Sequence, residues 1–220
     1  YTYVDKFWDS SIIPTLSKYI EIPNQSPAFD KEWKVAGHTD KAVALLTDWV
    51  KAQNVPGLEL EVLQEDGRTP LIFMTVPSNG DLDRTILMYG HFDKQPPLTD
   101  SWAEGLHPYK PVIKDGKLYG RGGADDGYSI FAAICAIKSL KESGAHHSRI
   151  VIVIEGCEES GSPDLPHYIS KLKDRIRVPD LIVCLDSGCG TYDQFWITTS
   201  LRGIVAGILK VEVTKEGSHS

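Results

Sequence analysis

Apolar residues recur along this chain at two spacings, one of about two residues and one of about 3.6 residues. Segments of the first kind, or of continuous apolar character, are predicted to be strands. These are residues Leu58–Val62, which alternate cleanly, and the denser runs Leu71–Val76, Thr85–Tyr89, Ile150–Ile154 and Leu181–Leu185. The four dense runs predict strands inside a sheet rather than half-exposed ones.

Other segments have the spacing of helices. The predicted helices are Lys6–Ile20, Thr39–Ala52, Ser129–Leu140 and Asp164–Arg175. Pro14 is compatible with the first of them only near a first turn or at a kink. Asp115 and Gly116 predict the two-residue turn of a hairpin over Val112–Tyr119.

Strands that alternate with helices predict an α/β fold, with a mostly parallel central sheet flanked by helices. In such sheets, functional sites lie beyond the carboxyl ends of the strands. The pattern changes at Gly203, after which Ile204–Val213 alternates as a long strand would. We therefore expect residues 1–202 to form the N-terminal part of one domain, and residues 203–220 to be the first strand of a second domain, cut off at Ser220.

The composition argues against nucleic acid and membrane as partners. The chain has 220 residues and a formal net charge of -7, and it has no basic run that would neutralise the phosphates of a nucleic acid. No apolar run approaches the roughly 20 residues of a membrane span, and the N-terminus shows no signal peptide. The four cysteines form no Cys-x-x-Cys pair, so reduced thiols and a cytoplasmic location are expected.

Side chains that suit a metal follow the predicted strands. His91 and Asp93 end one strand and point to the same face, so that Asp93 can accept the second ring proton of a metal-bound His91. Glu158–Glu159 and Asp186 follow two further apolar runs, and Asp125 opens a helix. Imidazole and carboxylate together suit Zn²⁺, with Mn²⁺ or Co²⁺ as alternatives.

Two of these positions have the pattern of a two-metal hydrolytic site. Asp125-Asp126, flanked by glycines, fits a carboxylate that bridges metals about 3.5–4 Å apart. Glu158-Glu159 offers one acid as a ligand and the other as a general base.

Each motif alone also has an ordinary structural interpretation. Asp125-Asp126 could cap the helix that follows, and Glu158-Glu159 could be solvated surface. A second His-x-Asp, His38-Thr39-Asp40, begins a predicted helix, where residues two apart do not share a face, so we assign it to helix capping. The motifs gain weight because they occur together, in order, at strand ends.

At this point the motifs resemble those of a known family, the di-zinc peptidases and deacylases. That family includes carnosinase, bacterial dipeptidases, glutamate carboxypeptidase, aminoacylase, acetylornithine deacetylase and succinyl-diaminopimelate desuccinylase. The motifs are Tyr89-Gly90-His91-Phe92-Asp93, Leu118-Tyr119-Gly120-Arg121-Gly122-Gly123-Ala124-Asp125-Asp126, Glu155-Gly156-Cys157-Glu158-Glu159-Ser160-Gly161-Ser162 and Leu185-Asp186. The sequences of these motifs are most similar to those of the carnosinase-like dipeptidase branch.

The resemblance implies two Zn²⁺ ions and a role for each motif. His91 and Asp186 would bind one metal, Asp125 would bridge both, and the peptide bond after Asp125 is often cis in the family. Glu159 would bind the second metal. The general base for the metal-bound water would be Glu158.

Further implications concern the remainder of the chain. Asp93 would orient His91. Residues 203–220 would begin an inserted α+β lid that forms a homodimer, and His219 would polarise the scissile carbonyl in the partner subunit. The histidine ligand of the second metal would lie downstream of Ser220.

The resemblance also implies a substrate. An aspartate at Asp186 is typical of amino- or dipeptidases, which favours dipeptides or short peptides; N-acyl amino acids, cleaved by a deacylase, are the alternative substrate. Gly127-Tyr128 stands where Lys-Gly is frequent, which predicts an altered helix start and an intact site. A non-catalytic protein that binds peptide or metal, and a zinc-dependent nuclease or phosphodiesterase, are further alternatives; the acidic charge weakens the last.

Overall fold

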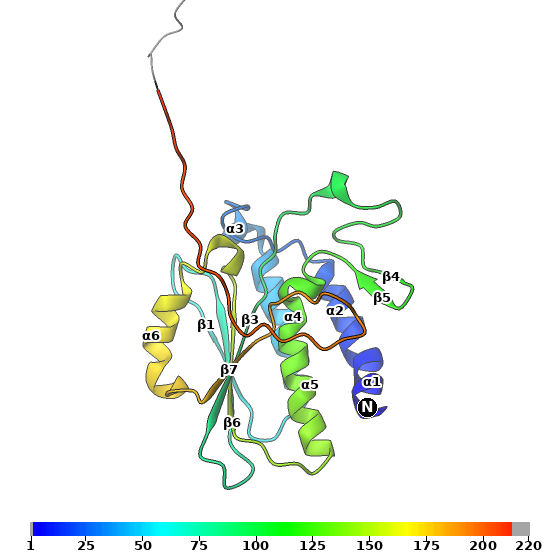
Figure 1. Cartoon of the computed structure of the whole chain (residues 1–220), viewed down its shortest axis with the longest axis vertical. Helices are drawn as coiled ribbons and strands as arrows, with labels where there is room; N and C mark the ends of the chain where they lie inside the picture. Colours follow the sequence, from blue (N-terminus) through cyan, green and yellow to red (C-terminus); the bar gives the residue numbers. More distant parts are fainter. Residues whose placement is uncertain (1, 213–220) are drawn as a thin grey trace, which may run out of the picture. The chain divides into compact units, whose positions relative to one another are not determined.

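The computed structural model describes residues 2–212, and the chain divides into two units, Tyr1–Asp186 and Ser187–Ser220. The first unit is built around a five-stranded sheet with the order β1-β2-β6-β3-β7 (Figure 1). Its strands are β1 (Glu59–Leu63), β2 (Leu71–Val76), β3 (Thr85–His91), β6 (Arg149–Glu155) and β7 (Leu181–Cys184). The α/β fold predicted from the sequence is confirmed.

The sheet contains both parallel and antiparallel pairs, because one strand runs in the opposite direction to the others. β3 pairs in parallel with β6 and with β7, with Leu87 opposite Val151 on one side and Ile182 on the other. β2 pairs antiparallel with both β1 and β6, so it alone runs against the other four. The carboxyl ends of β3, β6 and β7 therefore lie at the same edge of the sheet.

Strict alternation along the central strand β6 distributes its side chains to two cores. Ile150, Ile152 and Ile154 face the larger core, whereas Val151 and Val153 face a smaller one. Helices α2, α4 and α5 cover the first face and α6 covers the second (Figure 1). The helices are α1 (Thr2–Phe7), α2 (Ile13–Ile20), α3 (Trp33–Ala36), α4 (His38–Ala52), α5 (Ser129–Glu142) and α6 (Leu165–Ile176).

The predicted N-terminal helix is present but is interrupted before Pro14. A π-helical turn, Trp8–Ile12, joins α1 to α2, and Pro14 falls in the first turn of α2. Proline has no N–H for the bond to the preceding turn, and the wider turn removes the need for that bond. The hairpin is formed by β4 (Val112–Lys114) and β5 (Lys117–Tyr119), with both turn residues at positive φ, as a type I′ turn requires.

Two local predictions are wrong. The His38-Thr39-Asp40 segment does start α4, but Gly37 precedes it at φ 69° and no side chain caps the helix. β7 is an edge strand of the described sheet instead of an inner one, and Leu181 and Ile182 are 53% and 60% exposed. An apolar run shows that a strand can be buried on both faces, but it does not specify the neighbours of that strand.

The second unit has no helix or strand among its described residues, 187–212. The predicted strand Ile204–Val213 is therefore not formed over residues 204–212, and Val213 lies outside the described residues. A strand needs a partner for its backbone hydrogen bonds, and no described segment pairs with this one. The predicted division into residues 1–202 and 203–220 stays a prediction. Among the described residues, no helix is long and apolar enough to cross a membrane.

Candidate metal centre

The predicted site residues come from four segments that meet at the carboxyl edge of the sheet. His91 is the last residue of β3 and lies in register with Glu155, the last residue of β6. A single turn of 3-10 helix, Glu158–Ser160, follows β6, and Asp186 lies two residues beyond β7. This convergence is the one expected for parallel strands.

His91 is the centre of the cluster and is fully buried. Its Nε2 atom lies 3.2 Å from Asp125 Oδ1, 3.7 Å from Asp186 Oδ2 and 3.8 Å from Glu158 Oε2. Three carboxylates thus face one imidazole nitrogen. Because like charges repel in a partly buried site, a positive charge among them would stabilise the arrangement.

Asp93 connects two of the segments. Its two carboxylate oxygens accept the backbone N–H groups of Glu158 and Glu159, each at 3.0 Å. Asp93 Oδ1 also lies 3.4 Å from His91 Nδ1, and the backbone carbonyl oxygen of Asp93 is 3.1 Å from the same ring nitrogen. Asp93 therefore orients the histidine ring and also holds the turn that carries the two glutamates.

Asp125 and Asp126 have different surroundings although they are adjacent. The peptide bond between them is cis, as the resemblance implies, and neither has helical backbone angles. The Asp125 side chain faces His91, while the buried Asp126 carboxylate accepts the His91 backbone N–H at 3.1 Å. Gly90 makes this packing possible, since an added Cβ there would lie 2.6 Å from Asp126 Oδ2.

Glu158 and Glu159 also differ. Glu159 accepts a hydrogen bond from the Gln95 side-chain amide and interacts with Asp125, and its second oxygen is buried without a partner. In the described part of the chain, no hydrogen bond holds the Glu158 carboxylate, which is left pointing toward His91. Burial raises the pKa of both glutamates, that of Glu159 to about 7.

The shifted pKa values show how strongly the cluster attracts positive charge. Burial alone would lower the pKa of His91, but hydrogen bonds to Asp125 and Asp93 outweigh it and raise that pKa to about 11. Burial raises the pKa of Asp186, and it raises that of Asp126 to about 7. The carboxylates thus stay charged at lower cost when a cation lies between them.

The donor atoms fit divalent metal. Two groups have ligand atoms within 4.8 Å of one another: His91 with Asp125 and Asp186, and His91 with Glu158 and Glu159. The first group is the set predicted for one metal. His91 belongs to both groups, and Asp125 of the first group also interacts with Glu159 of the second. His219 lies outside the described residues.

Sequence reasoning missed the residues that support the site. Lys94 is fully buried and donates to the carbonyl oxygens of Tyr19, Ile20 and Ile22, at the C-terminal end of α2. Gln95, which bonds Glu159, is the second missed residue. Both residues follow Asp93 directly in the sequence. Polar residues just after a strand that ends in candidate site residues could have indicated a supporting role.

Comparison with known proteins identifies the family. The family model described as peptidase family M20/M25/M40 matches residues 87–217, more than half of the chain. The chain belongs to this peptidase family, and the resemblance seen in its motifs is confirmed. The match includes all four motif segments.

Individual relatives are more distant. The chain is 28% identical to the Cys-Gly metallodipeptidase dug1 of Schizosaccharomyces pombe, over all of this chain and 47% of that protein. It is also 28% identical to human Beta-Ala-His dipeptidase, over all of this chain and 44% of that protein. The chain thus spans about half the length of these relatives.

Solved structures give the same picture of the fold. The crystal structure of human carnosine dipeptidase 1 superposes with a TM-score of 0.69 at 27% identity, covering 84% of this chain and 40% of that one. The dipeptidase Dug1p of Saccharomyces cerevisiae gives a TM-score of 0.67 at 25% identity, covering 83% of this chain and 39% of that one.

Proposed function

We propose that the complete protein is a metal-dependent hydrolase that cleaves the peptide bond of dipeptides or short peptides. The observation that carries this proposal is the meeting of three carboxylates, from Asp125, Asp186 and Glu158, within 3.8 Å of His91 Nε2. The relatives named as Cys-Gly and Beta-Ala-His dipeptidases support dipeptides as the substrate class.

The assignment of the metal ligands rests on the resemblance of the motifs and, for the first cation, on the donor group His91, Asp125 and Asp186. His91, Asp125 and Asp186 would hold one cation, and Asp125 with Glu159 would hold another, completed by a histidine from a later part of the protein. We propose Zn²⁺ for both, because the set mixes imidazole with carboxylate. Two such ions would supply the Lewis acidity that activates water and polarises a scissile carbonyl.

The other side chains handle protons and orientation. Glu158 would be the general base, because its carboxylate reaches the cluster and no described residue hydrogen-bonds to it. It would take a proton from water and return that proton to the leaving amine. Asp93 would hold the His91 ring and the turn that carries Glu158.

The assembly of the whole protein is also a proposal. Residues 203–220 would begin a lid domain that forms a homodimer, and His219 would polarise the scissile carbonyl in the partner subunit's active site. Both rest on the resemblance of the motifs. A cytoplasmic location, expected from the cysteine pattern, likewise stays a prediction.

Activity of the full-length protein tests the proposal. We expect turnover of Cys-Gly or β-Ala-His with added Zn²⁺ or Mn²⁺, and its loss on chelation. Turnover that survives chelation would contradict the metal role. Cleavage of N-acetyl or N-succinyl amino acids alone would place the protein among deacylases, and metal binding without turnover of either class would make it a binding protein.

A single substitution tests the division of roles between the glutamates. Glu158→Gln keeps the side-chain shape but removes the base, so kcat should fall by roughly 10²–10⁴-fold. Bound metal, measured by elemental analysis, should stay at the level of the unmodified protein. Glu142→Gln on the exposed end of α5 is the control. Loss of metal with residual turnover in Glu158→Gln would show that the two roles are exchanged.

A further inference from the structure

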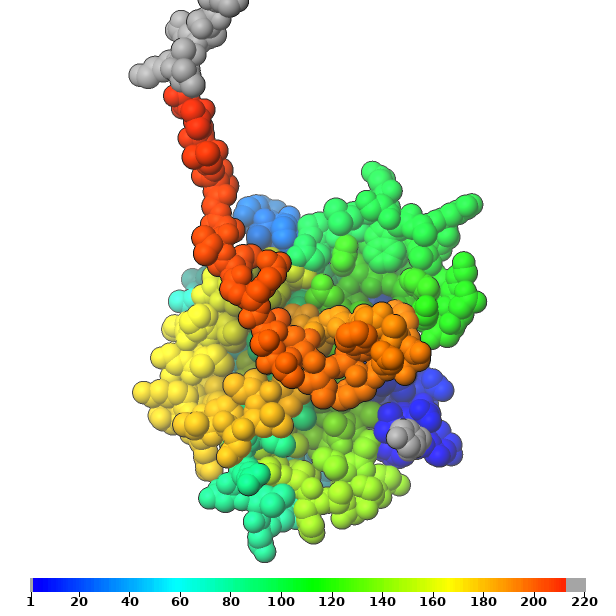
Figure 2. Space-filling view, in the orientation of Figure 1, coloured from blue at the N-terminus to red at the C-terminus, as the bar shows by residue number. Residues whose placement is uncertain are grey.

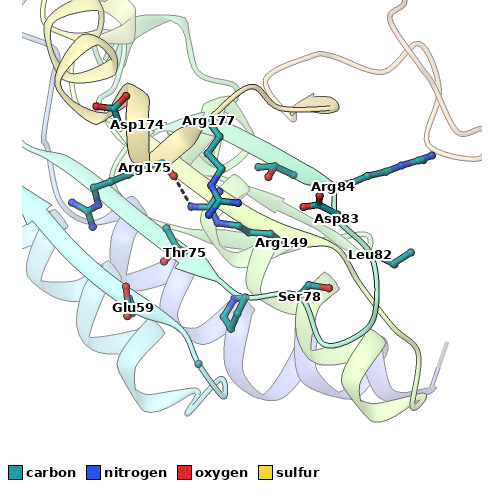
Figure 3. Close-up of a pocket in the computed structure, with 13 residues that line it drawn as sticks. Glu59, Thr75, Ser78, Leu82, Asp83, Arg84, Arg149, Asp174, Arg175 and Arg177 are labelled. Carbon is teal, nitrogen blue, oxygen red and sulfur yellow. Dashed lines mark hydrogen bonds between the residues drawn. The ribbon is translucent and has the colours of Figure 1, made fainter.

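A cavity of about 620 Å³ lies beside the first residues of β3 and β6 (Figure 3). Its lining includes Thr85 and Arg149, the first residues of β3 and β6, and Asp174, Arg175 and Arg177 at the end of α6, whereas His91 is the last residue of β3. β3 runs from Thr85 to His91, a length of roughly 20 Å for its strand geometry. The β2–β3 loop (teal) and the α6–β7 connection (gold) lie toward this end in Figure 2. The cavity is therefore separate from the candidate metal centre.

Four arginines line this cavity, and they are not equivalent. Arg175 donates to Glu61 at 2.6 Å and lies over the Phe73 ring, so its positive charge is paired with an acid of the protein itself. Arg149 donates to the carbonyl oxygens of Arg175 and Ile176 at 2.5 and 3.3 Å. These bonds fix the Arg149 guanidinium at the end of α6, with its remaining N–H groups available to the cavity.

Arg177 faces Arg149. Figure 3 shows the two side chains side by side in the cavity. Burial and then the charge of Arg177 lower the pKa of Arg149. In the described part of the chain, no acid lies within 4.0 Å of either guanidinium, although Glu59, Asp83 and Asp174 also line the cavity. The protein thus holds two like charges together without a direct counter-charge.

Arg177 has an unusual backbone conformation for a residue that carries a side chain. Its φ is 65° and its ψ is −162°, a region that is almost reserved for glycine. Glycine would adopt this conformation at lower cost, and the strained backbone of Arg177 leaves its guanidinium beside that of Arg149.

We propose that Arg149 and Arg177 form a binding site for a phosphate-bearing anion, either inorganic phosphate or the phosphomonoester group of a small metabolite. Guanidinium groups match phosphate oxygens with paired, charge-assisted hydrogen bonds. A doubly charged anion between them would remove the repulsion of the pair. The site is independent of the proposed peptidase activity, because none of its residues contributes to the metal centre.

Calorimetric titration of the full-length protein tests this proposal. Inorganic phosphate is added at constant ionic strength, with chloride as the balancing anion. Arg177→Gly is the informative variant, since it removes the guanidinium and relieves the backbone, and its Tm should not fall. Arg84→Gln is the matched control, because Arg84 also lines the cavity but extends away from the pair in Figure 3.

We expect saturable phosphate binding that weakens at least about tenfold in Arg177→Gly and is retained in Arg84→Gln. Phosphoserine in place of phosphate distinguishes the sources: tighter binding favours a phosphomonoester, and weaker binding favours free phosphate. The proposal would be overturned if the heat released on adding phosphate were no larger than the heat released on adding chloride at the same ionic strength. Equal binding by Arg177→Gly and the unmodified protein would overturn it as well.

Discussion

Replacement of Asp93 by asparagine gives a direct test of how the metal centre is held together. Asp93 is buried, and its two oxygens accept the N–H groups of Glu158 and Glu159 at 3.0 Å each. The asparagine side chain would keep the shape but would have one oxygen and one NH₂ group. One backbone N–H would then face another donor, while the other would keep a weaker, uncharged bond.

The size of the effect follows from these two bonds. An unsatisfied buried donor costs about 1–3 kcal/mol, and loss of charge assistance at the second bond costs about 1 kcal/mol more. Asp93→Asn should therefore lower the free energy of unfolding of the metal-free protein by roughly 2–4 kcal/mol. Because the residue also orients His91 and the turn carrying Glu159, metal affinity should fall by roughly 10–100-fold.

The matched control is Asp180→Asn. The Asp180 carboxylate accepts a single backbone N–H, from Thr85 at 2.8 Å, at the other end of β3. Urea unfolding measures stability, and competition with a fluorescent chelator measures zinc affinity. Asp180→Asn should lose stability but keep zinc affinity. If Asp93→Asn behaves like Asp180→Asn, with reduced stability and unchanged zinc affinity, the orienting role of Asp93 is refuted.

Three further substitutions probe the surroundings of the site. Gly90→Ala places a Cβ 2.1 Å from Ser129 Oγ, so we expect a loss of roughly 1–3 kcal/mol and a lower Tm. Lys94→Met removes the side-chain donor from the carbonyls of Tyr19, Ile20 and Ile22, of which that of Tyr19 keeps the Ile22 N–H; urea unfolding should show a loss of roughly 2–4 kcal/mol. Gln95→Leu removes the donor to Glu159, and zinc titration should show weaker binding by roughly tenfold, with Gln53→Leu as the control. An unchanged Tm, free energy of unfolding or zinc affinity in the respective variant would refute the role assigned to that contact.

The local parts of the fold could be predicted because they depend on neighbouring residues. The continuous β-branched run Ile150–Ile154 predicts a strand buried on both faces, and this strand is the centre of the sheet. The position of His91 at a strand end, with acids after two further strands, was sufficient to expect their convergence. Parallel strands bring their carboxyl ends to one edge whichever strands are neighbours.

Other features depend on which strands are neighbours, and no local pattern contains that information. Leu181 and Ile182 have the same apolar character as inner strands, yet β7 lies at the edge of the described sheet. The reversed direction of β2 likewise follows from its connections and not from its composition.

The sequence by itself determined most of the strands and helices, the α/β class and the acids and histidine that follow the strands, because periodicity and residue chemistry act over a few positions. Only the tertiary structure decided how those residues are supported. Asp93 reaches the Glu158 turn, and Lys94 reaches the end of α2, across more than 60 residues of chain in each case. Such contacts arise from the packing of distant segments, which also places Arg177 beside Arg149.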